Sequence, residues 1–204
     1  MIMKPQKDGT INYYENNAVL FAQDTENVHF TDVQERFLNK IHQGAYILDF
    51  GCGSGRDTKF FLEKGYSVDA IDGSVELCRL ASKNTGIDVR HMFFSELSET
   101  EKYDGIWACA SILHLPKEEL KTVLKKMIRA TKNDGIIYTS FKYGDFEGYR
   151  GERYFTDFTE ESFNVFLGYF REIELEDRWV STDVRPGRDN ERWLNLILRK
   201  SAIV

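Results

Sequence analysis

The segment ILDFGCGSGRD, residues 47–57, constrains the fold more than any other stretch of the chain. A continuous apolar run over residues 45–50 is typical of a strand that is buried on both faces. Three glycines follow it, and a helical pattern then covers residues 57–64. A strand that passes through a glycine turn into a helix is typical of a parallel α/β sheet. The turn is either a tight connection without a ligand or a loop that lets a ligand lie against the backbone.

The same alternation continues along the chain. Further strands are predicted at 66–71, 89–94, 105–110 and 135–141, and helices at 74–83 and 118–130. Alternating strands and helices predict a doubly wound, Rossmann-like α/β fold with a parallel sheet covered on both faces. A helix at 159–167 then precedes two strands, at 171–180 and 191–199. The loop between these strands is too short for a parallel return, so an antiparallel hairpin is expected to end the sheet.

Two amphipathic helices are predicted before the first strand. The second carries Val33, Phe37 and Ile41 on one stripe and is expected to pack on the sheet. The first has no obvious place in the layers and is a candidate lid, from which Tyr13 and Tyr14 would close over a ligand. These two rings could equally anchor the helix to the core.

With 204 residues, no repeat and no linker, the chain is expected to form one domain. Residues 1–43 would supply the lid and packing helices, 44–142 a cofactor-binding core, and 143–204 a substrate-side loop, helix and terminal hairpin.

Composition narrows the function classes. A net charge of −6 and a pI near 5.3 disfavour generic binding to nucleic acid. No apolar run is long enough to cross a bilayer and the N-terminus lacks a signal-type apolar region, so we expect a cytoplasmic protein without a membrane partner. Cys52, Cys78 and Cys109 have no metal-type spacing and cannot all pair, which suits a reducing compartment and predicts no metal site. A monomer or a homodimer is expected.

A second acidic signal accompanies the glycine turn. Asp72 ends the second predicted strand, 23 residues after Asp49, where a carboxylate can accept both hydroxyls of a ribose. The nicotinamide fingerprint G-x-G-x-x-G is not matched, because position 56 is Arg. The Asp49 carboxylate would also repel a pyrophosphate, whereas it suits the cationic end of an amino-acid-bearing nucleoside. These charges favour S-adenosylmethionine as the ligand.

In this order, ILDFGCGSGRD, VDAIDGS, YDGIWACASILHLP and GIIYTSF resemble the class I S-adenosylmethionine-dependent methyltransferases over residues 46–142. The segments FKYG, RYFTDFTEE and RPGR…RWLNLILRK resemble a bacterial branch near the tellurite-resistance and ubiquinone-pathway enzymes. The resemblance implies a seven-stranded sheet in the order 3-2-1-4-5-7-6, with strand 7 antiparallel.

The resemblance also implies a set of cofactor contacts. Asp49, Gly51 and Gly53 would contact the methionyl part, with Cys52 and Gly55 in the same turn, and Asp72 with Gly73 would lie at the ribose. The family often places an acid after the third strand to bind the adenine amine. Here that region reads MFFSEL, so the candidates are Phe94 and Glu96, and Phe94 could equally belong to the core. Tyr14 is the candidate contact from the lid.

The acceptor side is predicted from His114 and a group of basic residues. His114 follows the fourth strand, where the family lines its acceptor pocket, and could act as a base, orient the acceptor, or simply pack at the helix start. The basic residues would reach the same face and bind a carboxylate or phosphate of the acceptor. The alternative, which the sequence favours, is that they are ordinary polar loop residues whose charge Asp145, Glu147, Asp183 and Asp189 dilute. They are Lys142, Arg150, Arg153, Arg185 and Arg188.

Together these patterns predict an enzyme that transfers a methyl group from S-adenosylmethionine to a small-molecule acceptor. If the basic residues bind the acceptor, that acceptor is anionic. Alignment of acceptor and methyl is the main task of such an enzyme, so no catalytic triad or zinc motif is needed. DNA adenine methylation is disfavoured, because ACAS stands where a DPPY-like tetrad would follow the fourth strand. The alternatives are a non-catalytic sensor of the cofactor and a nicotinamide-dependent oxidoreductase.

Overall fold

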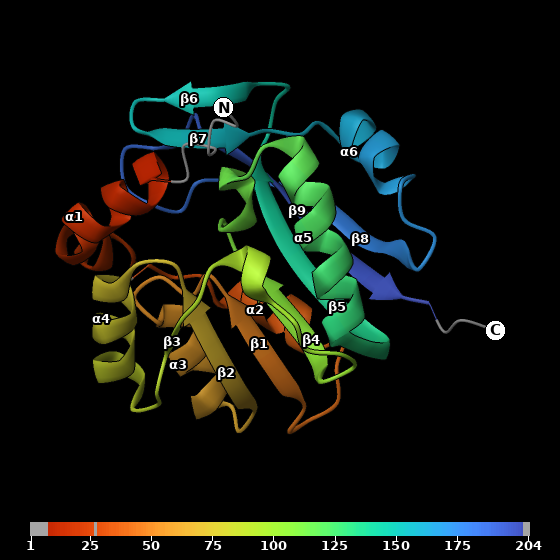
Figure 1. The fold of residues 1–204 in the computed structure, drawn as a ribbon, viewed down its shortest axis with the longest axis horizontal. Coiled ribbons are helices and arrows are strands. Elements are labelled where there is room, and N and C mark those ends of the chain that lie inside the picture. Colours follow the sequence, from red (N-terminus) through yellow and green to blue (C-terminus); the bar gives the residue numbers. More distant parts are fainter. Residues whose placement is uncertain (1–7, 27, 202–204) are drawn as a thin grey trace, which may run out of the picture.

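A computed structural model describes residues 8–26 and 28–201. In these residues a seven-stranded sheet has the order β3-β2-β1-β4-β5-β9-β8 (Figure 1). The first five strands of that order pair in parallel, and β9 is antiparallel to both β5 and β8. The strands are β1 (Tyr46–Phe50), β2 (Ser67–Asp72), β3 (Arg90–His91), β4 (Tyr103–Ala108), β5 (Thr131–Lys142), β8 (Ile173–Thr182) and β9 (Arg192–Lys200).

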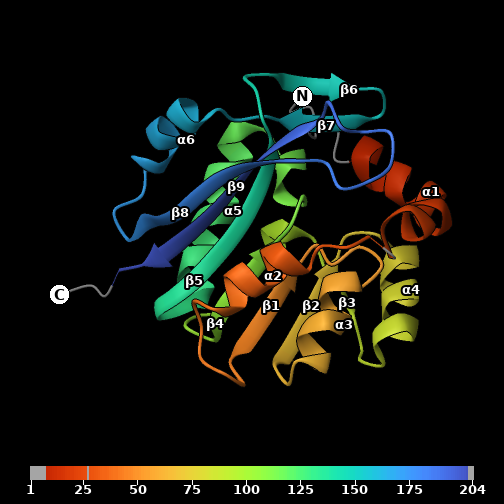
Figure 2. The same cartoon turned by 180° about the vertical axis from the view of Figure 1, so that it is seen from behind.

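Helices cover both faces of this sheet. The chain enters through α1 (Asp8–Glu26) and α2 (Thr31–Leu38), and α2 packs beside α3 on one face (Figure 2). The opposite face is covered by α5 and α6 (Figure 1). The remaining helices are α3 (Arg56–Glu63), α4 (Val75–Thr85), α5 (Lys117–Ala130) and α6 (Glu160–Leu167), with single 3₁₀ turns η1 (Phe94–Glu96) and η2 (Ile112–His114). The predicted α/β class, strand order and antiparallel end of the sheet are therefore confirmed.

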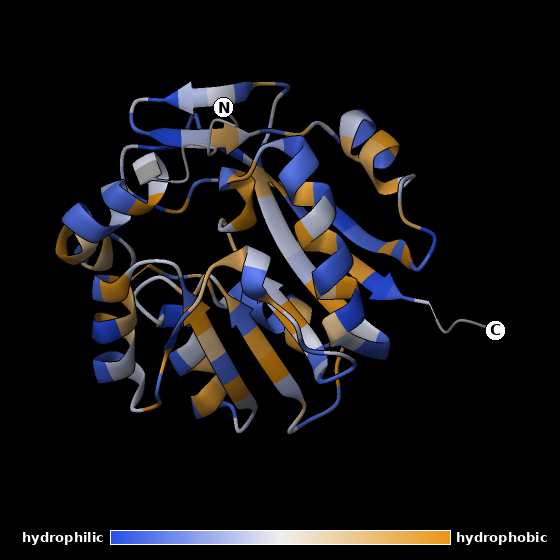
Figure 3. Ribbon diagram, viewed as in Figure 1, coloured by the Kyte–Doolittle hydropathy of each residue, from blue (hydrophilic) through white to orange (hydrophobic). Residues whose placement is uncertain are grey.

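An aromatic cluster fixes α2 and α3 to the middle of the sheet. The Trp107 indole on β4 stacks on the Tyr138 ring of β5, with their centroids 4.0 Å apart. Phe37 of α2 and Phe61 of α3 meet the same indole edge-on, at 5.2 and 5.3 Å. All four side chains are fully buried. Figure 3 shows the resulting pattern, with hydrophobic residues concentrated in the central strands and on the helix faces turned toward them.

Local capping sets where the helices begin. The Thr159 hydroxyl accepts the Ser162 N–H at 3.1 Å while the Ser162 hydroxyl accepts the Thr159 N–H at 2.9 Å, so two N–H groups at the start of α6 are satisfied reciprocally. At the start of α4 a single bond serves as the cap: the Ser74 hydroxyl accepts the Leu77 N–H at 3.2 Å. The predicted starts of these two helices lie within one residue of the observed ones.

Two local predictions were wrong. The expected third strand over 89–94 shortens to β3, because the chain turns into η1, where the Glu96 carboxylate accepts the Phe93 N–H at 2.8 Å. The loop expected after β5 contains a separate two-stranded hairpin, β6 (Glu147–Arg150) and β7 (Arg153–Thr156). This hairpin shifts the numbering of the last two strands but leaves the order of the main sheet unchanged.

The helix α1 lies outside the two covering layers, against α4 and β7 (Figure 1). It thus spans from the β1–β2 half of the molecule to the β6–β7 hairpin. Among the helices that the structure describes, none is both long and apolar enough to pass through a membrane.

Candidate active site

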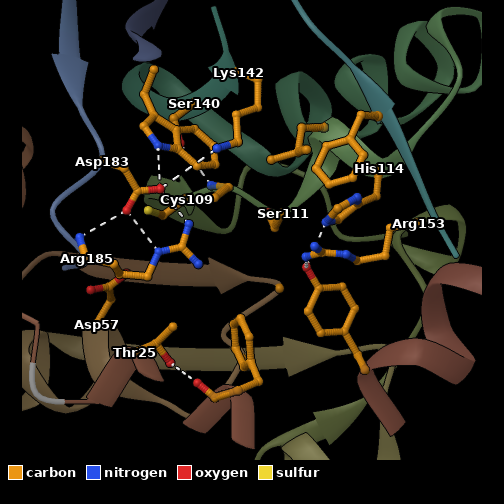
Figure 4. A pocket seen from close by; sticks show the side chains of 18 of the residues that line it. Thr25, Asp57, Cys109, Ser111, His114, Ser140, Lys142, Arg153, Asp183 and Arg185 are labelled. Atoms are coloured by element: carbon orange, nitrogen blue, oxygen red, sulfur yellow. Dashed lines mark hydrogen bonds and ion pairs between the residues drawn. The ribbon is translucent and has the colours of Figure 1, made fainter. Parts of the chain in front are cut away.

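A cavity of about 590 Å³ opens at the carboxyl ends of the parallel strands. Ligands of open α/β sheets bind at this edge, and the volume lies in the range of small-molecule sites. The turn after β1, the end of β2, the segment after β4 and the end of β5 each contribute to its wall. The loop between β8 and β9 closes one end, and α1 covers the glycine turn. Figure 4 shows this pocket from close by, with side chains from distant parts of the chain converging on it.

The glycine turn forms part of the cavity wall. Gly51, Gly53 and Gly55 have φ values of +87°, +56° and +83°, which side-chain-bearing residues rarely adopt. A Cβ on Gly51 would lie only 2.5 Å from the Ser111 Cβ, and one on Gly53 would lie 2.9 Å from the Phe21 ring of α1. Glycine is thus required at both positions by conformation and by space. Gly51, Cys52 and Gly53 line the cavity, whereas Gly55 is the N-cap of α3 and is not part of the lining.

Asp72 joins the glycine turn to the end of β2. Its carboxylate accepts the Gly53 N–H and the Ser74 N–H, both at 2.9 Å, and it lines the cavity beside Gly73. Burial raises the pKa of Asp72 to about 6, although the backbone N–H groups act in the opposite direction. Each carboxylate oxygen keeps acceptor capacity, so hydroxyl donors of a ligand can bind there in addition to the backbone.

Two further aspartates lie near the turn in different environments. Asp49 is 2% exposed, accepts the Thr58 hydroxyl at 2.5 Å and is not among the residues that line the cavity. Burial, together with the charge of Asp57, raises the pKa of Asp49. Asp57 lines the cavity and accepts both Arg56 and the Trp107 indole N–H. Burial alone would raise the pKa of Asp57, but these partners hold it below its usual value. The contact predicted for Asp49 stays a prediction.

An apolar wall adjoins Asp72. Phe94 belongs to it and packs against Phe50, with ring centroids 4.6 Å apart, so it contributes both to the core and to the cavity. Glu96, the other candidate for the adenine contact, is exposed and is absent from the cavity lining; its carboxylate holds η1 instead. The apolar side chains beside Asp72 are Leu77, Met92, Phe93 and Phe94.

His114 and Tyr14 meet across the cavity from elements 100 residues apart. The Tyr14 hydroxyl lies 2.8 Å from His114 Nε2, and His114 Nδ1 lies 2.6 Å from the Tyr154 carbonyl oxygen. Because a carbonyl can only accept, Nδ1 carries the proton and Nε2 accepts from Tyr14. Burial lowers the pKa of His114 to about 4, and nearby Arg153 adds to this effect. Tyr13 does not line the cavity; its ring packs under the Arg153 guanidinium at 4.5 Å.

The five predicted basic residues all line the cavity, which places them on the face of the glycine turn. Acidic residues of the same loops neutralise most of them. Arg150 pairs with Asp157, and Arg185 pairs with Asp183 through contacts of 2.9 and 2.5 Å. Lys142 binds Glu191 and lies 3.8 Å from Asp183, and Arg188 lies 3.7 Å from Glu191. Figure 4 shows Lys142, Asp183 and Arg185 together, with His114 and Arg153 on the other side of the pocket.

Several lining residues escaped the sequence reasoning. Arg56 and Asp57 follow the glycine turn directly, so their position was a usable signal. Ser111 lies just after β4, and Ser140 lies near the end of β5. Because ligands bind beyond the carboxyl ends of parallel strands, both positions could have been predicted as lining residues. Trp193 and Asn195 approach from the antiparallel β9, and no local pattern distinguishes them from ordinary strand residues.

Comparison with known proteins identifies the family of this core. Residues 47–135 match the methyltransferase domain family. An uncharacterized methyltransferase of Staphylococcus carnosus (strain TM300) is 25% identical over 182 residues, which cover 83% of this chain and 82% of that protein.

Two solved structures share the fold. The 1,6-didemethyltoxoflavin-N1-methyltransferase of Burkholderia thailandensis, with bound 1,6-didemethyltoxoflavin and S-adenosylhomocysteine, superposes with a TM-score of 0.73 at 23% identity, over 94% of this chain and 85% of its own. The N-methyltransferase NodS of Bradyrhizobium japonicum WM9, in complex with S-adenosylhomocysteine, gives 0.69 at 12% identity, over 92% and 98%. The family match over residues 47–135, the fold and the glycine turn agree: this part of the chain is an S-adenosylmethionine-dependent methyltransferase domain.

Proposed function

We propose that this enzyme methylates a small molecule that binds in the same cavity as the cofactor. One observation carries the proposal: a single cavity extends from Gly53 and Asp72 at one end to Lys142 and Arg185 at the other. A cofactor bound at the first end and an acceptor bound at the second would therefore lie next to each other in one cavity. The bacterial branch suggested by the sequence motifs stays a prediction.

The residues at the first end fit the cofactor. The backbone of Gly51 and Gly53 leaves space that a side chain would fill, which suits the methionyl part. The Asp72 carboxylate has acceptor capacity for two ribose hydroxyls, and the apolar wall beside it suits a purine. When bound, the cofactor supplies a methyl group already activated by its sulfonium, so the protein needs no nucleophile of its own. The chain then has to align the acceptor and exclude water.

The helix α1 is proposed to act as the lid of this site. The Thr10 hydroxyl accepts the Tyr154 N–H at 3.0 Å, and the Tyr14 hydroxyl binds His114. At its other side, the Glu15 carboxylate accepts the Ser74 hydroxyl at 2.6 Å at the N-terminus of α4, where a negative charge is favourable. These tethers hold α1 across both halves of the cavity. A lid placed in this way would shield the transferring methyl group from water.

The acceptor is proposed to carry a carboxylate or a phosphate, since several basic side chains line its end of the cavity. That the related Burkholderia enzyme holds a small heterocycle beside S-adenosylhomocysteine supports a small molecule rather than a macromolecule. The acidic balance of the chain supports the same choice against nucleic acid.

Turnover with methyl-labelled S-adenosylmethionine tests this function. The purified protein is incubated with the labelled cofactor and fractions of a metabolite extract, and S-adenosylhomocysteine is measured in parallel. We expect label to enter a small molecule in proportion to the S-adenosylhomocysteine formed, and Asp72→Asn to reduce both. A non-catalytic sensor would bind the cofactor without consuming it. Tight binding of NAD with no binding of S-adenosylmethionine would contradict the proposal.

A further inference from the structure

Arg153 differs from the other predicted basic residues that line the cavity. In the part of the chain that the structure describes, no carboxylate lies within ion-pair distance of its guanidinium, whereas Lys142, Arg150, Arg185 and Arg188 each have one. Aromatic rings fix its position instead: the guanidinium lies 4.5 Å from the Tyr13 ring centroid and 5.2 Å from that of Phe155. It is a half-buried cation that lines the cavity, and none of the described carboxylates compensates its charge.

The Tyr14 hydroxyl lies beside this cation. Arg153 Nη1 is 3.4 Å from the Tyr14 oxygen, while the Tyr14 proton is directed to His114 Nε2. His114 therefore holds Tyr14 in place with its one free lone pair, and its other nitrogen is bound to the Tyr154 carbonyl. Neither nitrogen is left to take a proton from an acceptor unless α1 moves away. This arrangement therefore argues against the role of His114 as a general base.

The charges around His114 point the same way. The Tyr14 hydroxyl of α1 and the Tyr154 carbonyl of β7 bind its two ring nitrogens, and the Arg153 charge of β7 acts on it as well. The carboxylate that acts on Tyr14 is that of Asp72, whose charge contributes to raising the pKa of the Tyr14 hydroxyl. A protonated imidazole here would repel Arg153, so the ring stays neutral near pH 7 and the fixed positive charge of the subsite belongs to Arg153.

We propose that Arg153 is the specificity-determining residue for the acceptor and binds its carboxylate or phosphate, while His114 is a positioning residue that orients Tyr14 beside that group. The inference rests on the proposed function and adds to it the residue that selects the acceptor. An anion in this place would supply the counter-charge that no described carboxylate provides, and the guanidinium would bind it by charge-assisted hydrogen bonds. The two flanking rings keep the guanidinium in place before the anion arrives, which lowers the entropy cost of binding.

The test uses two small probes of equal shape, benzoate and its neutral analogue benzamide. Each is titrated calorimetrically into the full-length protein saturated with S-adenosylhomocysteine. We expect benzoate to bind at least about tenfold more tightly than benzamide, since a hydrogen bond to a charged group is worth that much or more. Arg153→Gln should remove this preference and Arg153→Lys should keep part of it. The matched control is Arg171→Gln, an exposed arginine outside the cavity lining, which should behave as wild type.

A pH series separates Arg153 from His114. Between pH 6.5 and 8.5 benzoate affinity should stay constant, because a guanidinium keeps its charge over this range. A loss of affinity with rising pH would assign the anion to a protonated His114 and overturn the proposal. Equal binding of the two probes, no binding of benzoate, or an Arg153→Gln protein that still prefers benzoate would overturn it as well. Binding of S-adenosylhomocysteine is measured first in every variant: its absence in the wild type would instead refute the proposed function.

Discussion

The most informative single substitution is Gly51→Ala, because its effect can be worked out atom by atom. The added methyl group would lie 2.5 Å from the Ser111 Cβ and 3.0 Å from the Phe94 ring, and both residues line the cavity. Ser111 cannot move freely to make room, since its hydroxyl donates to the Phe50 carbonyl at 2.6 Å. The backbone is also unfavourable for alanine at a φ of +87°.

The expected cost has two parts. A side-chain-bearing residue in the left-handed region costs about 1–2 kcal/mol. Overpacking against Ser111 and Phe94 adds about 1–3 kcal/mol. We therefore expect the free energy of unfolding of Gly51→Ala to fall by about 2–5 kcal/mol, measured by urea denaturation. Affinity for S-adenosylhomocysteine, measured by calorimetry, should fall at least about tenfold. A loss of about 1.4 kcal/mol of binding free energy, caused by the displaced cavity wall, is enough for that.

Gly86→Ala provides the matched control. Gly86 has a φ of +78°, close to that of Gly51, but a Cβ there would meet nothing within 4 Å. Only the backbone part of the cost applies, so we expect a loss of about 1–2 kcal/mol and unchanged affinity for S-adenosylhomocysteine. If Gly51→Ala were no less stable than Gly86→Ala and bound S-adenosylhomocysteine like wild type, the close approach at the glycine turn would be refuted.

Three further predictions follow from the same contacts. Because burial raises the pKa of Asp72 to about 6, half of the Asp72 carboxylates are protonated at that pH, and protonation weakens hydrogen bonds from ribose hydroxyls. Calorimetric affinity for S-adenosylhomocysteine should therefore rise as the pH increases through about 6 and level off about one pH unit above that value, whereas Asp72→Asn should be weaker and show no such rise. Tyr14→Phe leaves His114 Nε2 without its partner, at a cost of about 1–3 kcal/mol, so amides of α1 should exchange with solvent about tenfold faster or more; unchanged exchange would argue against the lid tether. Trp107→Phe removes an indole N–H donor from Asp57 and should lower the free energy of unfolding by about 2–3 kcal/mol; a loss below about 0.5 kcal/mol would show that this bond contributes little.

Most of the sheet could be predicted from sequence because β1, β4 and β5 each contain an apolar run that is buried on both faces. The antiparallel end followed from the length of one loop. The β6–β7 hairpin escaped, since three of the four residues of β6 are exposed and its strands carry Glu147, Arg150 and Arg153 rather than an apolar stripe. The end of β3 escaped for a different reason: a side chain, Glu96, competes with the strand ladder for the backbone N–H of Phe93.

At the site, features of the local backbone were accessible from sequence and long-range partners were not. Gly51 and Asp72 stand out because a turn and a strand end demand particular residue types there. The pairing of Arg150 with Asp157 or of Arg185 with Asp183 depends on loop conformation, which no periodicity encodes. The contact between Tyr14 and His114 joins residues 100 positions apart and arises only once α1 lies across the sheet edge.

A crystal structure of the protein grown with S-adenosylhomocysteine tests the central claim most directly. The account predicts the ligand in the cavity under α1, with its ribose hydroxyls within about 3 Å of the Asp72 carboxylate and its amino-acid part against the backbone of Gly51 and Gly53. A ligand bound elsewhere on the molecule, with the glycine turn closed by a side chain, would contradict it.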